Sequence, residues 1–329
     1  MAFRKAQIAR VGGKFLSYGE TSSGKSTFQL TFPKVACIDS ETGISHYEGV
    51  EIKLNNGNTY NNLVMVDNTA DIDTLEEDLD AFLDGEYDGE IETLSIDSET
   101  KFYNAFQVGA MEVEERRARR KGGDVDDANI SVKQWGRIKI INMKFQQAKI
   151  DLSSKGIHIV SVAQAVEQKN EDGKVIGYKP DMHKSVAFDY DTILRHFTKK
   201  DKEGNVTFWA EVIKDRTGVT KIGQIIENPT YDIWKDYFNE RNGLETNETS
   251  YRKDIKTSTE SMVDDADKSE AYANELKDIL KTLKESGKMD GISKVNAIIK
   301  EKKMDIKKLD TYESKELSEI VDLAKTFIW

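Results

Sequence analysis

The chain has 329 residues, with 59 acidic side chains against 48 lysines and arginines, and its formal net charge is −11. This length suffices for one large domain or two ordinary ones. A mean hydropathy of −0.61 suits a soluble protein of the cytoplasm. The sequence contains no apolar run of about 20 residues, so the pattern excludes a membrane-spanning helix. Its single cysteine, Cys37, excludes an internal disulfide and fits a reducing compartment.

Short apolar runs alternate with helical patterns from residue 14 to about residue 236. This alternation predicts an α/β fold in which helices cover a mostly parallel sheet. Apolar residues recur at helical spacing over residues 70–83 and 132–152. The expected strands are residues 14–18, 34–39, 62–66, 92–97, 157–163 and 206–213.

The composition changes near residue 239. Residues 239–268 are polar and show no period, so they are expected to form a flexible linker. The linker would separate a core domain at residues 1–238 from a small helical domain at residues 269–329. Three helical stretches are expected in the second domain, and apolar residues line one face of the first: Leu276, Ile279, Leu280 and Leu283.

The stretch GETSSGKST follows the first expected strand and matches the pattern G-x-x-x-x-G-K-[ST]. A glycine-rich turn lets several backbone N–H groups converge on phosphate oxygens, and the next helix adds the positive end of its dipole. Lys25 would contact the phosphates and Ser26 would hold Mg²⁺. An ordinary strand-to-helix turn is the alternative. The predicted nucleotide site consists of Gly19, Glu20, Thr21, Ser22, Ser23, Gly24, Lys25, Ser26 and Thr27.

Polar side chains stand at the ends of three further expected strands. Asp39 stands at the end of the second strand and Glu41 follows it, Asp97 ends the fourth strand and Gln164 follows the fifth. In a doubly wound sheet these strand ends border the ligand crevice. Glu41 could there deprotonate an attacking water, Asp97 could hold Mg²⁺, and Gln164 could sense a γ-phosphate. A solvated acidic turn, a helix N-cap and a surface glutamine are the respective alternatives.

Two basic features complete the set of candidates. Lys214 and Arg216 stand two residues apart at the end of the last expected strand, so both point to one side and could contact a phosphate or a carboxylate. The run EERRARRKGG at residues 114–123 would be a solvated helix face or a contact to nucleic-acid phosphates. The acidic net charge argues weakly against nucleic acid, because local charge decides binding.

Together these motifs resemble the RecA-type ATPase core over roughly residues 14–220. They resemble more specifically the phage nucleotide-binding family that includes Sak-type, RecA-like single-strand annealing and recombination proteins. The resemblance implies a RecA-like P-loop fold that binds ATP and Mg²⁺. It implies that Glu41 is the catalytic glutamate, that Asp97 lies on the metal side and that Gln164 is the sensor. It also implies that Lys214 and Arg216 reach the nucleotide of a neighbouring protomer.

The same resemblance implies two DNA-facing loops, at residues 111–131 and 167–184. The expected protein is a DNA-stimulated ATPase of the bacterial host cytoplasm that binds single-stranded DNA during recombination or annealing. It would form a ring or filament, and its C-terminal helices are the candidate site for a single-strand-binding protein. The expected DNA contacts are Arg116, Arg117, Arg119, Arg120, Lys121, Lys169 and Lys174.

Two other functions fit the same motifs. A nucleotide-gated adaptor would bind ATP, hydrolyse it very slowly and recruit a partner through its C-terminal helices. A small-molecule kinase would use EERRARRK as an arginine-bearing lid. The chain lacks the N-K-x-D of GTPases, and where the AAA+ pattern expects a glutamate beside Asp97 it has Ser98.

Overall fold

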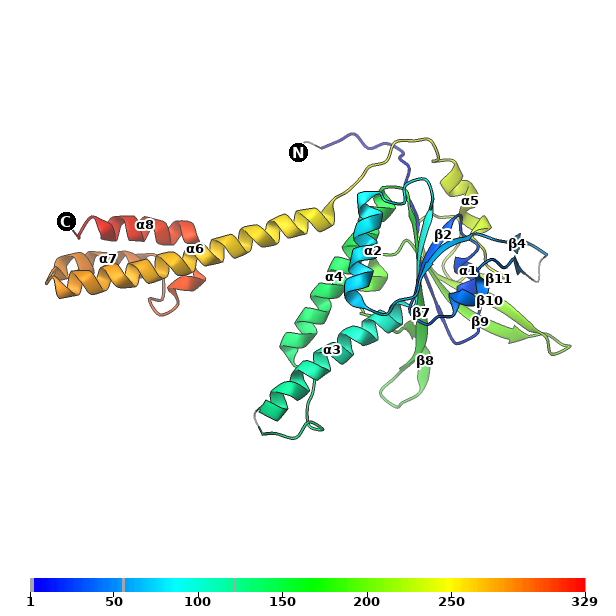
Figure 1. Cartoon of the computed structure of the whole chain (residues 1–329), viewed down its shortest axis with the longest axis horizontal. Helices are drawn as coiled ribbons and strands as arrows, with labels where there is room; N and C mark the ends of the chain where they lie inside the picture. Colours follow the sequence, from blue (N-terminus) through cyan, green and yellow to red (C-terminus); the bar gives the residue numbers. More distant parts are fainter. Residues whose placement is uncertain (1–2, 55–56, 121, 329) are drawn as a thin grey trace. The chain divides into compact units, whose positions relative to one another are not determined.

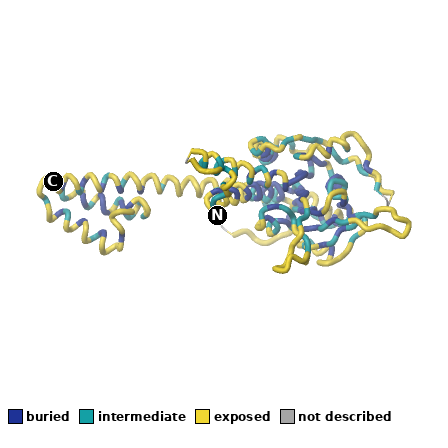
Figure 2. Tube along the Cα trace, turned by 90° about the horizontal axis from the view of Figure 1, so that it is seen from below, coloured by how far each residue is buried: buried dark blue, intermediate teal, exposed yellow. Residues whose placement is uncertain are grey.

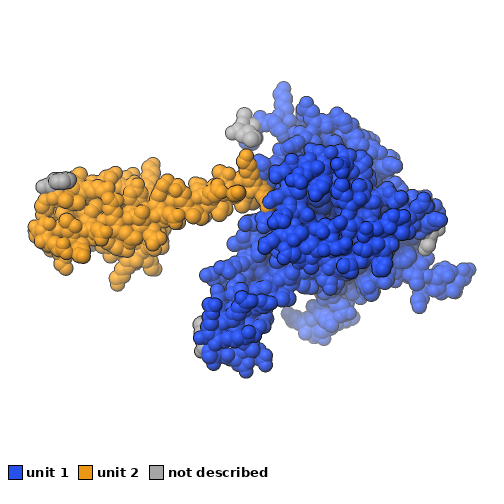
Figure 3. Space-filling view, viewed as in Figure 1, with its two compact units in different colours: residues 1–251 blue, residues 252–329 orange. Residues whose placement is uncertain are grey.

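The computed structural model describes residues 3–54, 57–120 and 122–328. The chain divides into two compact units, residues 1–251 and residues 252–329 (Figure 3). Lys121, one of the expected DNA contacts, lies outside the described residues.

A nine-stranded sheet forms the centre of unit 1 (Figure 1). Its strands are β1 (Lys14–Gly19), β2 (Val35–Asp39), β5 (Leu63–Asp67), β6 (Thr93–Asp97), β7 (His158–Lys169), β8 (Val175–Pro180), β9 (Thr192–Lys200), β10 (Val206–Asp215) and β11 (Ile225–Glu227). Their order is β11-β10-β9-β1-β7-β6-β2-β5, and β8 pairs with β7. The pairs from β9 to β5 are parallel, whereas β10, β11 and β8 pair antiparallel. The strands β3 (Ile52–Lys53) and β4 (Thr59–Tyr60) form a separate pair.

Helices cover both faces of this sheet, because two core clusters combine strand residues with different helices. Buried residues are concentrated inside unit 1 and exposed residues lie at its periphery (Figure 2). Successive strand residues point to opposite faces, so Ile38 of β2 joins one core cluster and Cys37 joins the other. The first cluster contains α2 (Ile72–Asp84), α3 (Glu99–Arg120) and α4 (Val132–Ser154). The second contains α1 (Lys25–Gln29), α5 (Asp232–Asn239) and the 3-10 turn η1 (Ile44–Tyr47).

A buried ion pair fixes the start of α3. The Glu99 carboxylate accepts hydrogen bonds from Lys149 of α4, from Gln146 at 2.7 Å and from the Tyr190 hydroxyl at 2.7 Å. Lys149 is 1 % exposed, and burial lowers its pKa while Glu99 counteracts that shift. Because breaking a buried pair leaves an uncompensated charge, this cluster holds α3 firmly where it follows β6.

Unit 2 is a separate helical unit. It contains α6 (Tyr251–Glu285), α7 (Met289–Glu301), the turn η3 (Leu309–Thr311) and α8 (Ser314–Lys325). The first residue of α6, Tyr251, is the last residue of unit 1. Gly287 adopts a left-handed φ of 73° just after α6, which lets the chain reverse direction. The apolar core of the unit includes Leu276, Leu283, Val295, Leu317 and Val321.

The structure confirms the predicted α/β core, its mostly parallel sheet and the C-terminal helices. Three segments differ from expectation. Residues 167–184 are largely a hairpin, because β7 continues to Lys169 and pairs with β8. Residues 111–120 belong to α3, so among the described residues of the expected loop at 111–131 only residues 122–131 are non-helical. The expected flexible linker at 239–268 is helical from Tyr251 onward, because charged residues also suit a solvated helix.

Candidate functional site

The turn between β1 and α1 requires glycine at both ends of the sequence motif. Gly24 has a left-handed φ of 91° and precedes the first helical residue. A Cβ built on Gly19 would lie 2.3 Å from the carbonyl oxygen of His196. A side chain at either position would distort the turn, since left-handed backbone and such close approach both favour glycine. The backbone of the turn is therefore free of side chains at Gly19 and Gly24.

Lys25 begins α1 and folds over the turn. Its ammonium donates a hydrogen bond of 2.6 Å to the carbonyl oxygen of Glu20. Burial is the largest influence and lowers the pKa of Lys25, while Asp97, Glu41 and Glu20 oppose the shift. The Lys25 charge therefore lies near both carboxylates that the sequence assigned to the site.

Asp97 ties the first helix to the sheet. Its Oδ2 accepts hydrogen bonds from Ser26 Oγ at 2.8 Å and from Gln29 Nε2 at 2.6 Å. The other side of the Gln29 amide accepts a hydrogen bond from Ser95 on β6. Burial raises the pKa of Asp97 to about 6, although the hydrogen bonds from Ser26 and Gln29 oppose the shift. Gln29 was not predicted from the sequence. The only feature that could have indicated its contact with the site is its place one helical turn after Lys25.

Asp39 and Glu41 have different positions after β2. The Asp39 carboxylate accepts hydrogen bonds from the backbone N–H groups of Glu41 at 2.9 Å and Ile44 at 2.8 Å, so it shapes the turn. Glu41 is exposed, and its Oε1 accepts hydrogen bonds from Ser98 Oγ at 2.7 Å and Gln164 Nε2 at 3.3 Å. The structure thus brings together Glu41, Gln164 and Ser98, the residue after Asp97.

Strand register explains this convergence. Gly19 of β1 is the partner of Gln164 on β7, and Asp39 of β2 is the partner of Asp97 on β6. The carboxyl ends of four adjacent parallel strands therefore lie at one edge of the sheet, where α/β proteins bind their ligands.

Gln164 is also connected to the β7–β8 hairpin. Its backbone N–H donates a hydrogen bond of 3.0 Å to Thr100 Oγ1 on α3. Its carbonyl oxygen accepts one of 2.8 Å from the N–H of Asp181, just after β8. The Thr100 hydroxyl in turn donates to the carbonyl oxygen of Asp181 at 2.8 Å. Gln164 is therefore hydrogen-bonded to the base of the hairpin.

Lys214 and Arg216 point to the same side, as expected, but within this chain they contact another segment. The ammonium of Lys214 donates to the carbonyl oxygens of Ala187 at 3.2 Å and Phe188 at 3.1 Å. Arg216 also donates to the Phe188 carbonyl, at 3.1 Å, and pairs with Asp191 at 3.4 Å. Their contacts lie on the 3-10 turn η2 (Val186–Phe188) and its flank, so a role at a neighbour's nucleotide stays a prediction.

The described members of the expected DNA-contact set lie on α3 and on the β7–β8 hairpin. Lys169 pairs with Glu167 at 3.0 Å, and Lys174 begins the return of the hairpin. Arg120 ends α3 and is exposed. Three members of the arginine run form ion pairs along α3: Arg116 with Glu112, Arg117 with Glu114 and Arg119 with Glu115. These pairs are typical of a solvated helix face.

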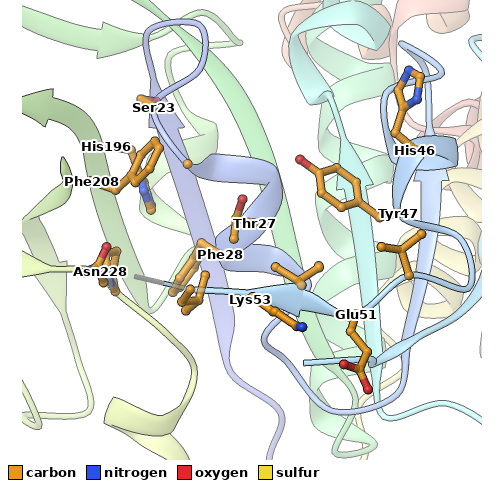
Figure 4. Close-up of a pocket in the computed structure, with 15 residues that line it drawn as sticks. Ser23, Thr27, Phe28, His46, Tyr47, Glu51, Lys53, His196, Phe208 and Asn228 are labelled. Atoms are coloured by element: carbon orange, nitrogen blue, oxygen red, sulfur yellow. The ribbon is translucent and has the colours of Figure 1, made fainter. Parts of the chain in front are cut away.

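A pocket of about 330 Å³ opens beside the glycine-rich turn (Figure 4). Gly24, Thr27 and Phe28 contribute to its lining from the end of the turn and from α1. Ser23 of the predicted nucleotide site also lines the pocket. The other lining residues were not predicted from the sequence to bind a ligand: His46, Tyr47, Val50, Glu51, Ile52, Lys53, Leu54, His196, Phe208, Asn228 and Pro229. The volume and the aromatic lining suit part of a small organic ligand.

Comparison with protein families gives a direct result. A family model described as an AAA domain matches residues 12–229. The chain belongs to this family. The match begins just before β1, ends just after β11 and includes every residue assigned above to the nucleotide site. Unit 1 therefore contains an AAA-type nucleotide-binding domain of ATPase type, and its mixed α/β sheet is consistent with a RecA-like P-loop fold. The serine at position 98, which departs from the AAA+ pattern, does not place the chain outside the AAA domain family.

Other comparisons are less specific. No curated protein matches the sequence. Among solved structures, the chain is similar to the flagellar accessory protein FlaH of Methanocaldococcus jannaschii, with 11% identity and a TM-score of 0.33. That similarity covers 67% of this chain and 85% of FlaH. Among the described residues, no helix has the length and apolar character needed to cross a membrane.

The donor atoms at the AAA domain's turn fit magnesium. Ser26 Oγ and Asp97 Oδ2 are hard oxygen donors only 2.8 Å apart. Mg²⁺ commonly takes one or two protein oxygens and completes its shell with water and phosphate oxygens. Among the described residues there is no cluster of three or more acidic, histidine or cysteine side chains that could hold a metal ion. A nucleotide-bound Mg²⁺ does not require such a cluster. Ser26 and Asp97 would hold the ion.

The raised pKa of Asp97 predicts a pH dependence. Below about pH 6 the carboxyl becomes protonated, so Mg²⁺-dependent nucleotide binding should weaken by up to about tenfold per pH unit. The free energy of unfolding should instead rise as the pH falls below about 6, because a carboxyl whose pKa is raised by folding favours the folded state when it is protonated. Calorimetric titration with ATP from pH 8 to pH 5, with Mg²⁺ and with EDTA, measures the first effect. An unchanged contribution of Mg²⁺ at pH 5 would contradict the assignment of Asp97.

Proposed function

We propose that the chain is a Mg²⁺-dependent ATPase that assembles with copies of itself and acts on single-stranded DNA during recombination or annealing. The observation that carries the enzymatic part is the convergence of Lys25, the Ser26–Asp97 pair and Glu41 at one edge of the sheet. An AAA-type domain supports nucleotide binding. The DNA-related part rests on the sequence resemblance.

Each residue of the site has a distinct proposed role. Lys25 and the turn amides bind phosphate oxygens, as a positive charge and a set of N–H donors do. Bound ATP with Mg²⁺ supplies the phosphoanhydride bond that is cleaved and part of the charge neutralisation. Glu41 would take the proton of the attacking water, since its carboxylate is exposed and oriented by Ser98 and Gln164.

The pocket beside the turn is the proposed place of the base and ribose. It adjoins Gly24 and Thr27, so a nucleotide whose phosphates lie on the turn could extend into it. Tyr47 and Phe208 offer aromatic faces there, and stacking on such faces binds bases without strong sequence preference. Asn228 supplies polar groups at the rim.

A Glu41→Gln variant tests the enzymatic proposal. It should bind ATP with nearly unchanged affinity and lose hydrolysis by about a hundredfold or more, because the amide cannot take a proton. The matched control is Glu48→Gln, which neutralises an exposed glutamate a few residues away. ATP turnover of both variants and of the wild type is measured with and without single-stranded DNA.

The outcomes of this experiment separate the candidate functions. Wild-type turnover that rises with single-stranded DNA supports the full proposal. Tight ATP binding with turnover no faster than that of Glu41→Gln would make the chain an adaptor. Transfer of phosphate to an acceptor without any effect of DNA would make it a kinase. Equal loss of ATP binding in Glu41→Gln would mean that Glu41 has a structural role.

The proposed role of Lys214 and Arg216 is to stabilise phosphate charge in a neighbouring protomer, which can accelerate phosphoryl transfer by orders of magnitude. A Lys214→Ala, Arg216→Ala variant should bind ATP and hydrolyse it poorly. Mixing it with Glu41→Gln should restore part of the activity, because some interfaces then combine an intact Glu41 with an intact basic pair. Lys221→Ala, which removes a nearby exposed cation, is the control. If mixed oligomers form but activity stays low, the basic pair does not act across an interface.

A further inference from the structure

The outer face of α4 carries an exposed apolar stripe. Val132 is 89 % exposed, Ile140 is 51 % exposed and Met143 is 42 % exposed. Together with Gly136 these residues follow helical spacing, so they lie on one side of α4. Apart from its chain neighbours and the backbone of its own helix, no described atom lies within 4 Å of the position that a Cβ on Gly136 would occupy. Another helix could therefore approach the backbone closely at this point.

The flanks of this stripe are basic. Residues 128–150 contain no acidic side chain, although the whole chain has a formal net charge of −11. The four exposed cations of α4 lie among the apolar residues: Lys133, Arg137, Lys139 and Lys144. A surface with an apolar centre and basic flanks complements an acidic amphipathic helix.

The chain contains such a helix in the first part of α6. All residues from 256 to 264 are exposed, and they include Met262 at 74 % and Val263 at 54 % exposure. An isolated helix gains little stability from its own hydrogen bonds, so a partner along this stretch would stabilise it. From residue 260 to residue 270 there is one cation, Lys268, and the acidic residues are Glu260, Asp264, Asp265, Asp267 and Glu270.

We propose that the outer face of α4 binds residues 254–270 of α6 from a second copy of the chain. The four exposed cations of α4 would face the acidic residues of α6, and Ile140 and Met143 would pack against Met262 and Val263. Single-stranded nucleic acid would also match the cations, and Trp135 beside the stripe, 42 % exposed, offers it one ring for stacking. Val132, Ile140 and Met143 have no rings, so most of the stripe suits the apolar side chains of a helix better than bases. The inference does not depend on ATP hydrolysis.

Two charge-reversal variants of the full chain test this contact. The first is Lys133→Glu, Arg137→Glu, Lys144→Glu on α4, and the second is Glu260→Lys, Asp264→Lys, Asp267→Lys on α6. Sedimentation velocity at low and high salt gives the mass of each variant and of their mixture, and circular dichroism checks that both fold. We expect wild-type chains to associate, and each variant alone to associate at least about tenfold more weakly. The mixture should regain association, because the reversed surfaces complement each other.

A single substitution tests the apolar part. Ile140→Glu should weaken association, whereas Ile176→Glu, which places the same charge at an aliphatic residue of β8 that is 67 % exposed, should not. The proposal is overturned if the wild type is monomeric at all concentrations, or if the charge-reversed variants associate like the wild type. It is also overturned if their mixture stays monomeric. Loss of binding to oligo-dT in the α4 variant without any change of mass would assign this face to nucleic acid instead.

Discussion

The arrangement of the site depends on two hydrogen bonds to one buried oxygen. Oδ2 of Asp97 accepts from both Ser26 and Gln29, so it fixes α1 and the glycine-rich turn against β6. The same strand pairs with β2, which places the turn after Asp39 beside the peptide that follows Asp97. There the Ser98 hydroxyl reaches Glu41. The Asp97 carboxylate thereby holds the glycine-rich turn, while the strand that carries Asp97 and the Ser98 hydroxyl place the candidate base beside it.

Burial of the Asp97 carboxylate costs free energy, and neighbouring groups offset part of that cost. A buried carboxylate is destabilising unless its oxygens are hydrogen-bonded, and the raised pKa of Asp97 reports the burial. The hydrogen bonds from Ser26 and Gln29 and the nearby charge of Lys25 compensate for part of the desolvation of this carboxylate. The Glu99–Lys149 pair then anchors α3 two residues further along the chain. In an AAA-type domain such pre-organisation is useful, because groups that are already oriented need not reorganise during phosphoryl transfer.

The sequence predicted the features that depend on local pattern. The turn at residues 19–27 and the polar ends of the parallel strands follow from spacing and from the rule that ligands bind at carboxyl strand ends. It did not predict contacts that depend on strand order and side-chain packing, such as those of Gln29 and Ser98 or the pocket that Tyr47 and Phe208 line. Charged segments were the least predictable, since the first part of α6 was expected to be a flexible linker and the β7–β8 hairpin a loop.

The central claim is that the turn at residues 19–27 binds the phosphates of a nucleotide. Calorimetric titration of ATP·Mg²⁺ into the wild type, Lys25→Ala and Lys34→Ala tests it most directly. Lys34 is a matched control, because it is an exposed lysine beyond α1 that pairs with Glu92. The account predicts that Lys25→Ala weakens ATP binding by about a hundredfold or more, as loss of a charge-assisted phosphate contact would, while Lys34→Ala binds like the wild type. Equal affinity of all three proteins for ATP would contradict it.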